Sequence, residues 1–155
     1  MKNGLPFTVE VVAEVTKIPS SSNSSLINIA DGMQSSGLIV SYNSNSIFCA
    51  CKDSWGGNTY ITIGKNWNFM AMPFYCGMSM NGANEYGYMF FKTLNEEIEG
   101  HSSSIKQNIL TIDLTKMIIG GYAWSSIASR NHRGMVYCIR IYDRALNNEE
   151  LSYNY

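Results

Sequence analysis

The sequence has few charged residues and no long apolar run. Only 15% of its 155 residues are Asp, Glu, Lys or Arg, and the formal net charge is −1. Without clustered lysine and arginine there is no basic surface to bind phosphates, so we expect no nucleic-acid partner. No apolar stretch approaches the roughly 18–20 residues that a membrane-spanning helix needs, so we expect no membrane insertion either.

Cysteine is scarce, and the N-terminal residues lack a secretory pattern. Four cysteines are too few for a disulfide scaffold, and we expect reduced thiols in the core at Cys49, Cys51, Cys76 and Cys138. The sequence contains no Cys-x2-Cys pair, so it does not indicate a zinc site. The opening residues, MKNGLPFTVEV, contain no apolar segment of the roughly 7–15 residues found in signal peptides. We therefore expect an intracellular protein, a virion component or a piece of a larger chain.

Motifs that would indicate an enzyme are also missing. The sequence contains no G-x-S-x-G nucleophile elbow and no glycine-rich phosphate loop. Three carboxylates, those of Glu96, Glu97 and Glu99, fall in the polar segment 95–104, which we expect to be a solvated loop. We therefore predict a protein without catalytic activity.

What the sequence does have is a high apolar content in short alternating runs. Hydrophobic residues make up 45% of the chain, enough for one core, and we expect a single domain over residues 1–155. Turn signals recur at about every 8–12 residues, which is typical of an all-β sandwich. The expected strands are 5–18, 26–30, 37–42, 46–52, 60–63, 67–80, 86–93, 109–114, 117–119 and a last one from 134. The predicted fold is a two-sheet antiparallel jelly-roll sandwich with a short C-terminal helix.

Two of these runs carry more detailed predictions. In the run 5–18, apolar residues alternate with a polar set that includes Thr8 and Glu10, so we expect a half-buried strand with its polar face in solvent. The run 67–80 contains Pro73, which has no N–H to donate, so we expect a bulge or an edge position there.

The C-terminal segment Gly134–Leu151 is the most informative stretch. It reads GMVYCIRIYDRALNNEEL, an apolar strand followed by a charged corner and a short helix. Asn147 is suited to cap the helix, with Glu150 three residues later as in a capping box. Leu146 before the cap and Leu151 in the helix are placed to form a hydrophobic staple. We expect this corner to fasten the C-terminus to the sandwich.

This segment resembles the C-terminal motif of laminin-G-like domains in the concanavalin A-like lectin/glucanase superfamily. In that family a final strand of the type G-x-I-D-E-V-R-I-Y-N-R-A-L precedes a short helix. Asp143 stands in place of the family's Asn, and the matching positions are Gly134, Val136, Ile139, Arg140, Ile141, Tyr142, Arg144, Ala145 and Leu146. Segments 7–13 and 117–121 are similar to the family's first long strand and to its Y-I-G-G strand. The resemblance implies a concanavalin A-like, lectin-like fold and a role in adhesion.

The departures from the family pattern limit what can be carried over. Tyr137 and Cys138 stand where the family has an acidic pair, so no role of that pair transfers. The E-x-D-x-E run of the superfamily's glycoside hydrolases does not occur. Calcium is common in the superfamily, but the aspartates Asp31, Asp53, Asp113 and Asp143 are scattered along the chain. We expect no cofactor, and the sequence leaves calcium open.

Aromatic residues supply the candidate binding sites. The chain has ten tyrosines and three tryptophans. Sugar recognition uses flat aromatic faces together with a few placed polar groups. Two predicted loops combine these features, one with Trp55 and Asn58 and the other with Trp124, Arg130 and His132. We predict these five as ligand-binding residues, and structural packing of the two tryptophans is the alternative.

The sequence thus favours a non-catalytic recognition or adhesion module. Its expected partner is a glycan or a protein surface, either in a homo-oligomer or within a larger assembly. A bacteriophage virion or a bacterial surface protein is the expected context. Two alternatives stay open: a purely structural virion or assembly domain without a sugar site, and a divergent glycoside hydrolase.

Overall fold

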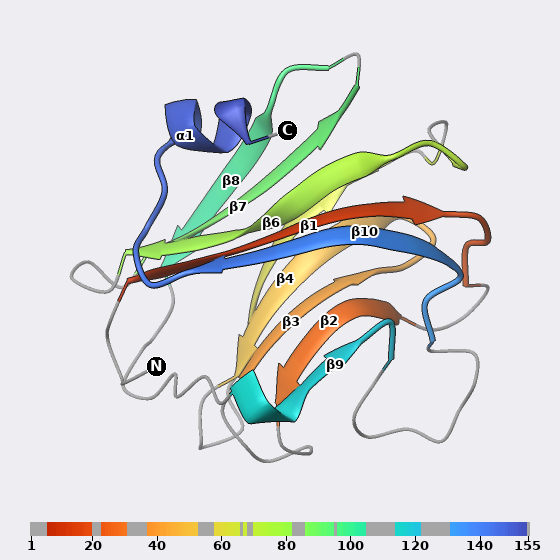
Figure 1. Cartoon of the computed structure of the whole chain (residues 1–155), viewed down its shortest axis with the longest axis horizontal. Coiled ribbons are helices and arrows are strands. Elements are labelled where there is room, and N and C mark those ends of the chain that lie inside the picture. The colour runs from red at the N-terminus through yellow and green to blue at the C-terminus, as the bar shows by residue number, and fades with distance from the viewer. Residues whose placement is uncertain are drawn as a thin grey trace.

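The computed structural model describes residues 6–19, 23–30, 37–52, 58–65, 67, 70–81, 86–94, 96–104, 114–121 and 131–154. Over these residues the chain forms two antiparallel five-stranded sheets that face each other, with one short helix at the C-terminal end (Figure 1). The predicted all-β sandwich with a C-terminal helix is therefore confirmed. Among the described residues, no helix is long and apolar enough to cross a membrane.

Each sheet combines strands from distant parts of the chain. The first sheet has the order β10-β1-β6-β7-β8, and the second has the order β5-β4-β3-β2-β9. The strands of the first sheet are β1 (Phe7–Val15), β6 (Phe74–Asn81), β7 (Tyr86–Thr93), β8 (Glu99–Ser104) and β10 (Gly134–Tyr142). Those of the second are β2 (Ser24–Ala30), β3 (Gly37–Tyr42), β4 (Ser46–Lys52), β5 (Asn58–Gly64) and β9 (Met117–Ile119). A 3-10 turn, η1 (Leu114–Lys116), precedes β9, and α1 (Asn148–Tyr153) follows β10.

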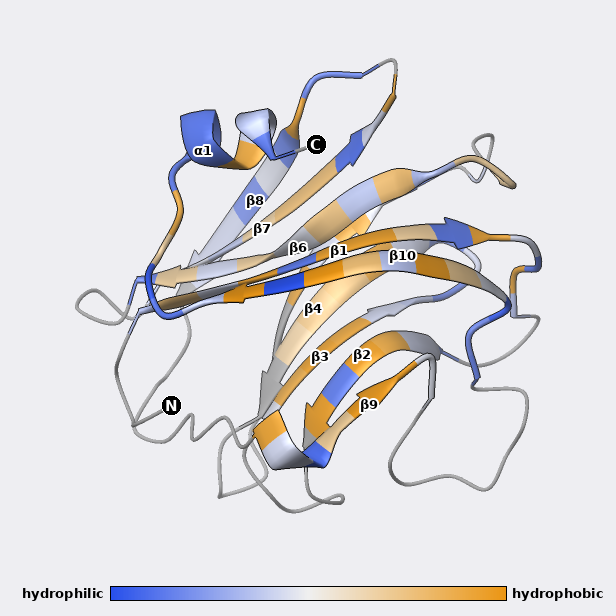
Figure 2. Cartoon of the chain, in the orientation of Figure 1, coloured by the Kyte–Doolittle hydropathy of each residue, from blue (hydrophilic) through white to orange (hydrophobic). Residues whose placement is uncertain are grey.

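The main core lies between the two sheets. Hydrophobic residues recur along the strands of both sheets (Figure 2), and the inward set from β1 to β7 forms one buried cluster. Cys49 and Cys76 lie within it as buried reduced thiols, as predicted, and burial raises the pKa of the Cys76 thiol. Cys138 is also reduced but only half-buried, and the side chain of Cys51 lies outside the described residues.

The prediction of a solvated loop over residues 95–104 is wrong for the second half of this segment. Glu99–Ser104 forms the edge strand β8, which pairs with β7 in register from Phe91↔Glu99 to Tyr86↔Ser104. An edge strand needs only backbone hydrogen bonds on one side, so a run of serine and histidine can form one without an apolar face. Hydrophobic periodicity therefore gives no sign of it.

The edge position predicted for the run 67–80 is also wrong. The strand begins only at Phe74, immediately after Pro73, so the missing N–H of the proline falls outside the hydrogen-bonded ladder. β6 then lies in the centre of its sheet, between β1 and β7. Met78 and Met80 are buried in the core, whereas Met70 and Met72 lie before the strand and are exposed. The strand expected at 109–114 falls on undescribed residues up to 113, and Leu114 begins η1.

The polar face of β1 was expected in solvent, yet Thr8 and Glu10 have no exposed surface at all. They point away from the main core, on the face where β6 contributes Ser79 and Gly77. The C-terminal corner and α1 cover this outer face, where Leu146 and Leu151 join Tyr75 and Phe90 in a second hydrophobic cluster.

Candidate functional site

The C-terminal corner begins where β10 ends and is built on a capped helix. The Asn147 side chain accepts a hydrogen bond from the Glu150 N–H at 3.0 Å, and the Glu150 carboxylate accepts one from the Asn147 N–H at 2.9 Å. This is the predicted capping box. Leu146 and Leu151 on either side of the cap are both buried in one cluster, as the predicted staple requires.

Buried hydroxyls on the sheet hold this corner in place. The Thr8 hydroxyl accepts a hydrogen bond from the Leu146 N–H at 2.9 Å and lies 2.9 Å from the Arg144 carbonyl oxygen. The Ser79 hydroxyl donates to the Leu146 carbonyl at 3.1 Å. Since the corner's backbone groups are bonded to two different strands, its position on the sheet is fixed.

The Glu10 carboxylate ties the end of the helix to the same face. It accepts hydrogen bonds from the Tyr75 hydroxyl at 2.6 Å and the Asn154 amide at 2.8 Å. The Tyr142 hydroxyl and the Arg140 guanidinium donate to its second oxygen at 3.3 and 3.4 Å. A fully buried carboxylate is stable only when it is paired and hydrogen-bonded in this way. Burial, and then the adjacent carboxylate, raise the pKa of Tyr75.

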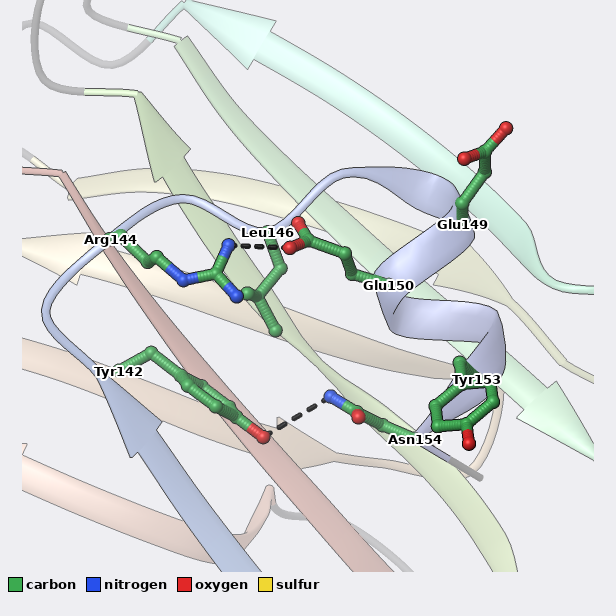
Figure 3. A pocket seen from close by; sticks show the side chains of 7 residues that line it. All are labelled: Tyr142, Arg144, Leu146, Glu149, Glu150, Tyr153 and Asn154. Carbon is green, nitrogen blue, oxygen red and sulfur yellow. Dashed lines mark hydrogen bonds and ion pairs between the residues drawn. The ribbon is translucent and has the colours of Figure 1, made fainter.

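These contacts frame an open pocket of about 350 Å³ between the corner and α1 (Figure 3). Its lining residues are Tyr142, Arg144, Leu146, Glu149, Glu150, Tyr153 and Asn154. The Tyr142 hydroxyl accepts a hydrogen bond from the Asn154 amide at 3.1 Å, which fixes that wall. Tyr153, which lies beside Asn154 at the end of α1 (Figure 3), is 91% exposed. Aromatic and aliphatic surface with a few placed polar groups is the composition of a small-molecule or sugar site.

The charges of this corner pocket are partly compensated. Arg144 Nη1 lies 2.6 Å from Glu150 Oε1, with both side chains partly in solvent. The pKa of Glu150 is lowered, first by the hydrogen bond from the Asn147 N–H and then by Arg144. Glu149 is exposed, so the pocket contains one paired cation and one additional carboxylate.

A second pocket, of about 610 Å³, is lined by Ile18, Ser44, Asn45, Gly64, Lys65 and Trp67. Its two largest side chains are engaged in the fold. Trp67 packs edge-on against Tyr42, with ring centroids 5.3 Å apart. Lys65 Nζ lies 2.5 Å from Glu99 Oε2 and 4.2 Å from the centre of the Phe91 ring. These groups are engaged in the fold, whereas the corner pocket also includes the exposed ring of Tyr153 and the exposed carboxylate of Glu149, so the corner pocket is the better candidate.

Most of the binding residues predicted from the sequence lie outside the described residues. This applies to Trp55, Trp124 and Arg130. Asn58 begins β5 opposite Lys52, but its side chain is not described. The described residues therefore do not test whether the five come together, and their role in binding stays a prediction.

His132 is described, and its ring is held by the sandwich. Nδ1 lies 3.0 Å from the Tyr42 hydroxyl, and Nε2 lies 3.3 Å from the Met135 carbonyl oxygen. With Tyr42 as donor to Nδ1, the neutral ring carries its proton on Nε2 and donates it to Met135. Burial lowers the pKa of His132.

The residues of the corner pocket were missed as a site because their roles in the fold came first. Arg144 and Leu146 are part of the corner that the sequence assigns to C-terminal anchoring. The available signal is compositional: Tyr142 and Tyr153 lie 11 positions apart, with arginine, two glutamates and asparagine nearby. The same combination of aromatic and polar residues was recognised in the two loops.

No metal centre is evident in the described part of the chain. Within those residues, no three histidine, cysteine, aspartate or glutamate side chains come together as ligands. Asp31, Asp53 and Asp113 lie outside the described residues, so calcium binding by them is untested.

The fold defines a β-sandwich of the class found in carbohydrate-binding and receptor-binding domains. The CBM40 of a Ruminococcus gnavus IT-sialidase matches with a TM-score of 0.73 and 12% identity, over 97% of this chain and 82% of that one. The same module is also known bound to α2,3-sialyllactose. The botulinum neurotoxin serotype D binding domain matches with a TM-score of 0.72 and 17% identity, over 97% of this chain but only 36% of that one.

These likenesses show the fold. A ligand-binding domain of serotype D in complex with N-acetylneuraminic acid matches with a TM-score of 0.70 and 17% identity, and this chain again spans 36% of its length. No protein-family model matches the sequence, and no curated protein matches it. The laminin-G-like placement therefore stays a prediction.

Proposed function

We propose that this chain is a non-catalytic carbohydrate-binding module and that the corner pocket is its ligand site. The observation that carries the proposal is the lining of that pocket. Tyr142 and Tyr153 offer aromatic surface to a sugar ring, and Arg144, Glu149 and Asn154 offer groups for its hydroxyls. The buried Glu10 network fixes Tyr142 and Asn154 before any ligand arrives, which lowers the entropic cost of binding.

The structural neighbours support the proposal to different degrees. The R. gnavus module is similar over most of its own length and is known with a bound sialyllactose. The neurotoxin domains lend less support, because this chain spans 36% of their length and their ligand can lie in the remainder. In all of them the named role is binding.

The finer parts of the proposal rest on the sequence. We include in it a single laminin-G-like domain over residues 1–155, acting in adhesion within a phage virion or a bacterial surface protein. One core cluster joins residues of both sheets, which supports a single folding unit. The genes beside this one would show whether the chain belongs to a virion or to a surface protein.

A glycan array followed by titration tests the function. We expect the purified chain to bind at least one glycan class. Tyr153→Ala should weaken that binding about tenfold, which corresponds to about 1.4 kcal/mol, because it removes an exposed ring from the corner pocket. Tyr86→Ala is the matched control, since Tyr86 is an exposed tyrosine of β7 (55%) that does not line this pocket. If no glycan binds at millimolar concentration, the function is wrong.

The loop residues give a second location for the same function. Trp55→Ala and Trp124→Ala should leave binding unchanged if the corner pocket is the site. If either abolishes binding while Tyr153→Ala does not, the ligand is bound by the predicted loops instead, and the function stands with a different site.

A structural assembly role is the second candidate, and the edge strand β10 favours it. Met135 and Tyr137 on this strand are more than half exposed, at 56% and 53%, and edge strands offer unpaired backbone groups to a partner. Size-exclusion chromatography with light scattering distinguishes the roles: a stable trimer or larger species without glycan binding indicates assembly. Release of reducing sugar from a polysaccharide would show a glycoside hydrolase.

A further inference from the structure

The corner pocket is acidic, and this restricts the sugars it can take. Its lining contains one arginine and two glutamates, Arg144, Glu149 and Glu150. Asp143, the neighbour of Arg144 in the chain, is exposed and adds another carboxylate close by. The pair formed by Glu10 and Arg140 beneath Tyr142 is balanced in charge and does not offset them.

The one cation of the lining is already engaged. Arg144 Nη1 lies 2.6 Å from Glu150 Oε1. Glu150 cannot easily turn away, because its other oxygen accepts the hydrogen bond of the Asn147 N–H at 2.9 Å, as part of the helix cap. Only Nη1 of Arg144 is paired in this way, but its positive charge is compensated by a carboxylate that the fold itself holds in place, so Arg144 attracts a ligand carboxylate less strongly than an unpaired arginine would.

The polar groups beside the tyrosines also favour ligand donors over ligand acceptors. The Asn154 amide nitrogen donates to both Glu10 at 2.8 Å and Tyr142 at 3.1 Å, which uses both of its hydrogens. The Tyr142 hydroxyl donates in turn to Glu10 at 3.3 Å. The pocket therefore presents mainly oxygen acceptors, from Glu149, Glu150 and the amide oxygen of Asn154.

From this arrangement we infer that the corner pocket takes a neutral hexose or a hexosamine and discriminates against sialic acid. The inference rests on the proposed function and separates this chain from the sialyllactose-bound module that shares its fold. Hydroxyl and ammonium groups of the ligand donate to the carboxylates of the pocket, while the carboxylate of a sialic acid is repelled by them.

The test compares matched pairs of glycans that differ only in a terminal sialic acid, such as lactose and α2,3-sialyllactose, together with glucosamine-containing oligosaccharides. We expect each sialylated member to bind at least tenfold more weakly than its uncharged counterpart. Binding of glucosamine-containing ligands should weaken as salt is raised, because their ammonium group is attracted by exposed carboxylates. Equal or tighter binding of the sialylated members, sensitive to Tyr153→Ala, overturns the inference and leaves the function standing.

Two variants test whether charge is the cause. E150Q removes the partner of Arg144 but keeps an amide oxygen for the helix cap, since glutamine also serves in a capping box. It should reduce the difference in affinity between sialylated and uncharged ligands about tenfold. E149Q is the control variant, because it removes a negative charge without releasing Arg144 from Glu150. It should reduce the difference in affinity less than E150Q does. If E150Q melts as the wild type does and leaves this difference in affinity unchanged, the inference is wrong. It is also wrong if Tyr153→Ala has no effect on glycan binding. Failure of every glycan to bind contradicts the proposed function itself.

Discussion

At the scale of single residues, the buried carboxylate of Glu10 is the most consequential feature. It has no exposed surface and four hydrogen-bond donors from β6, β10 and the end of α1. We predict that Glu10→Ala lowers the free energy of unfolding by about 3 kcal/mol, because Arg140 and the Tyr75 hydroxyl then lose their partner. Urea denaturation measures this change.

Glu14 provides the control for that prediction. It lies on the same face of β1 but is less buried, and it accepts a hydrogen bond from the exposed Tyr137 hydroxyl at 2.8 Å. Glu14→Ala should lower the free energy of unfolding by less than about 0.5 kcal/mol. Equal effects of the two substitutions would show that the Glu10 network does not hold the helix.

His132 predicts a dependence of stability on pH. Because burial lowers its pKa in the folded protein, the unfolded chain binds the proton more readily. The contribution of the neutral ring is therefore complete above the unfolded pKa of about 6.5 and is lost as pH falls below it, through the folded pKa. Between pH 7.5 and pH 5.5, the urea midpoint of unfolding should fall more in the wild type than in His132→Gln. Parallel pH profiles in the two proteins would refute the role of this histidine.

At the scale of elements, the helix cap makes a local and separable prediction. Asn147→Ala removes the side-chain acceptor of the Glu150 N–H and should lower the free energy of unfolding by about 1 kcal/mol. Ser152→Ala, at an exposed position within α1, should have little effect. Thermal melts followed by circular dichroism compare the two, and a neutral Asn147→Ala would mean that tertiary contacts alone keep α1 in place.

The elements also show what the sequence can and cannot reveal. The helix was predictable because the capping box and the staple use residues at most five positions apart. The burial of Glu10 was not, because the residues that cover it come more than 120 positions later, from β10 and α1. A polar residue on an alternating strand reads as exposed unless its distant partners are known. β8 was missed for the related reason that backbone pairing leaves no hydrophobic pattern.

At the scale of the whole molecule, the sandwich was predictable and the site was not. The ten expected runs, with their alternation and regular turns, favour an all-β sandwich. A pocket, in contrast, depends on where a corner lies relative to a helix, and the corner here was assigned to anchoring alone. Trp55 and Trp124, with the loops predicted around them, are outside the described residues, so the binding experiments test their prediction.

The closed core predicts the reactivity of the thiols. Cys49 and Cys76 have no exposed surface, so in a C51S/C138S protein they should react with a thiol reagent only after the sandwich opens. Their labelling should therefore rise with urea in parallel with global unfolding. The C51S variant, which retains the half-buried Cys138, should label faster under native conditions. Rapid labelling of the double variant in buffer alone would indicate a core that opens locally.

The pairing of β1 with both β10 and β6 has a consequence for biosynthesis. Seven residues of β1 are matched to β6, and the last strand of the chain closes its other edge. During translation β1 is made well before its neighbour β10, so one edge of β1 and the polar face beneath α1 stay uncovered until residues 134–154 have been made. A nascent chain stalled before residue 134 would present an open strand edge and a bare Glu10, and such a chain would be a natural substrate for chaperones.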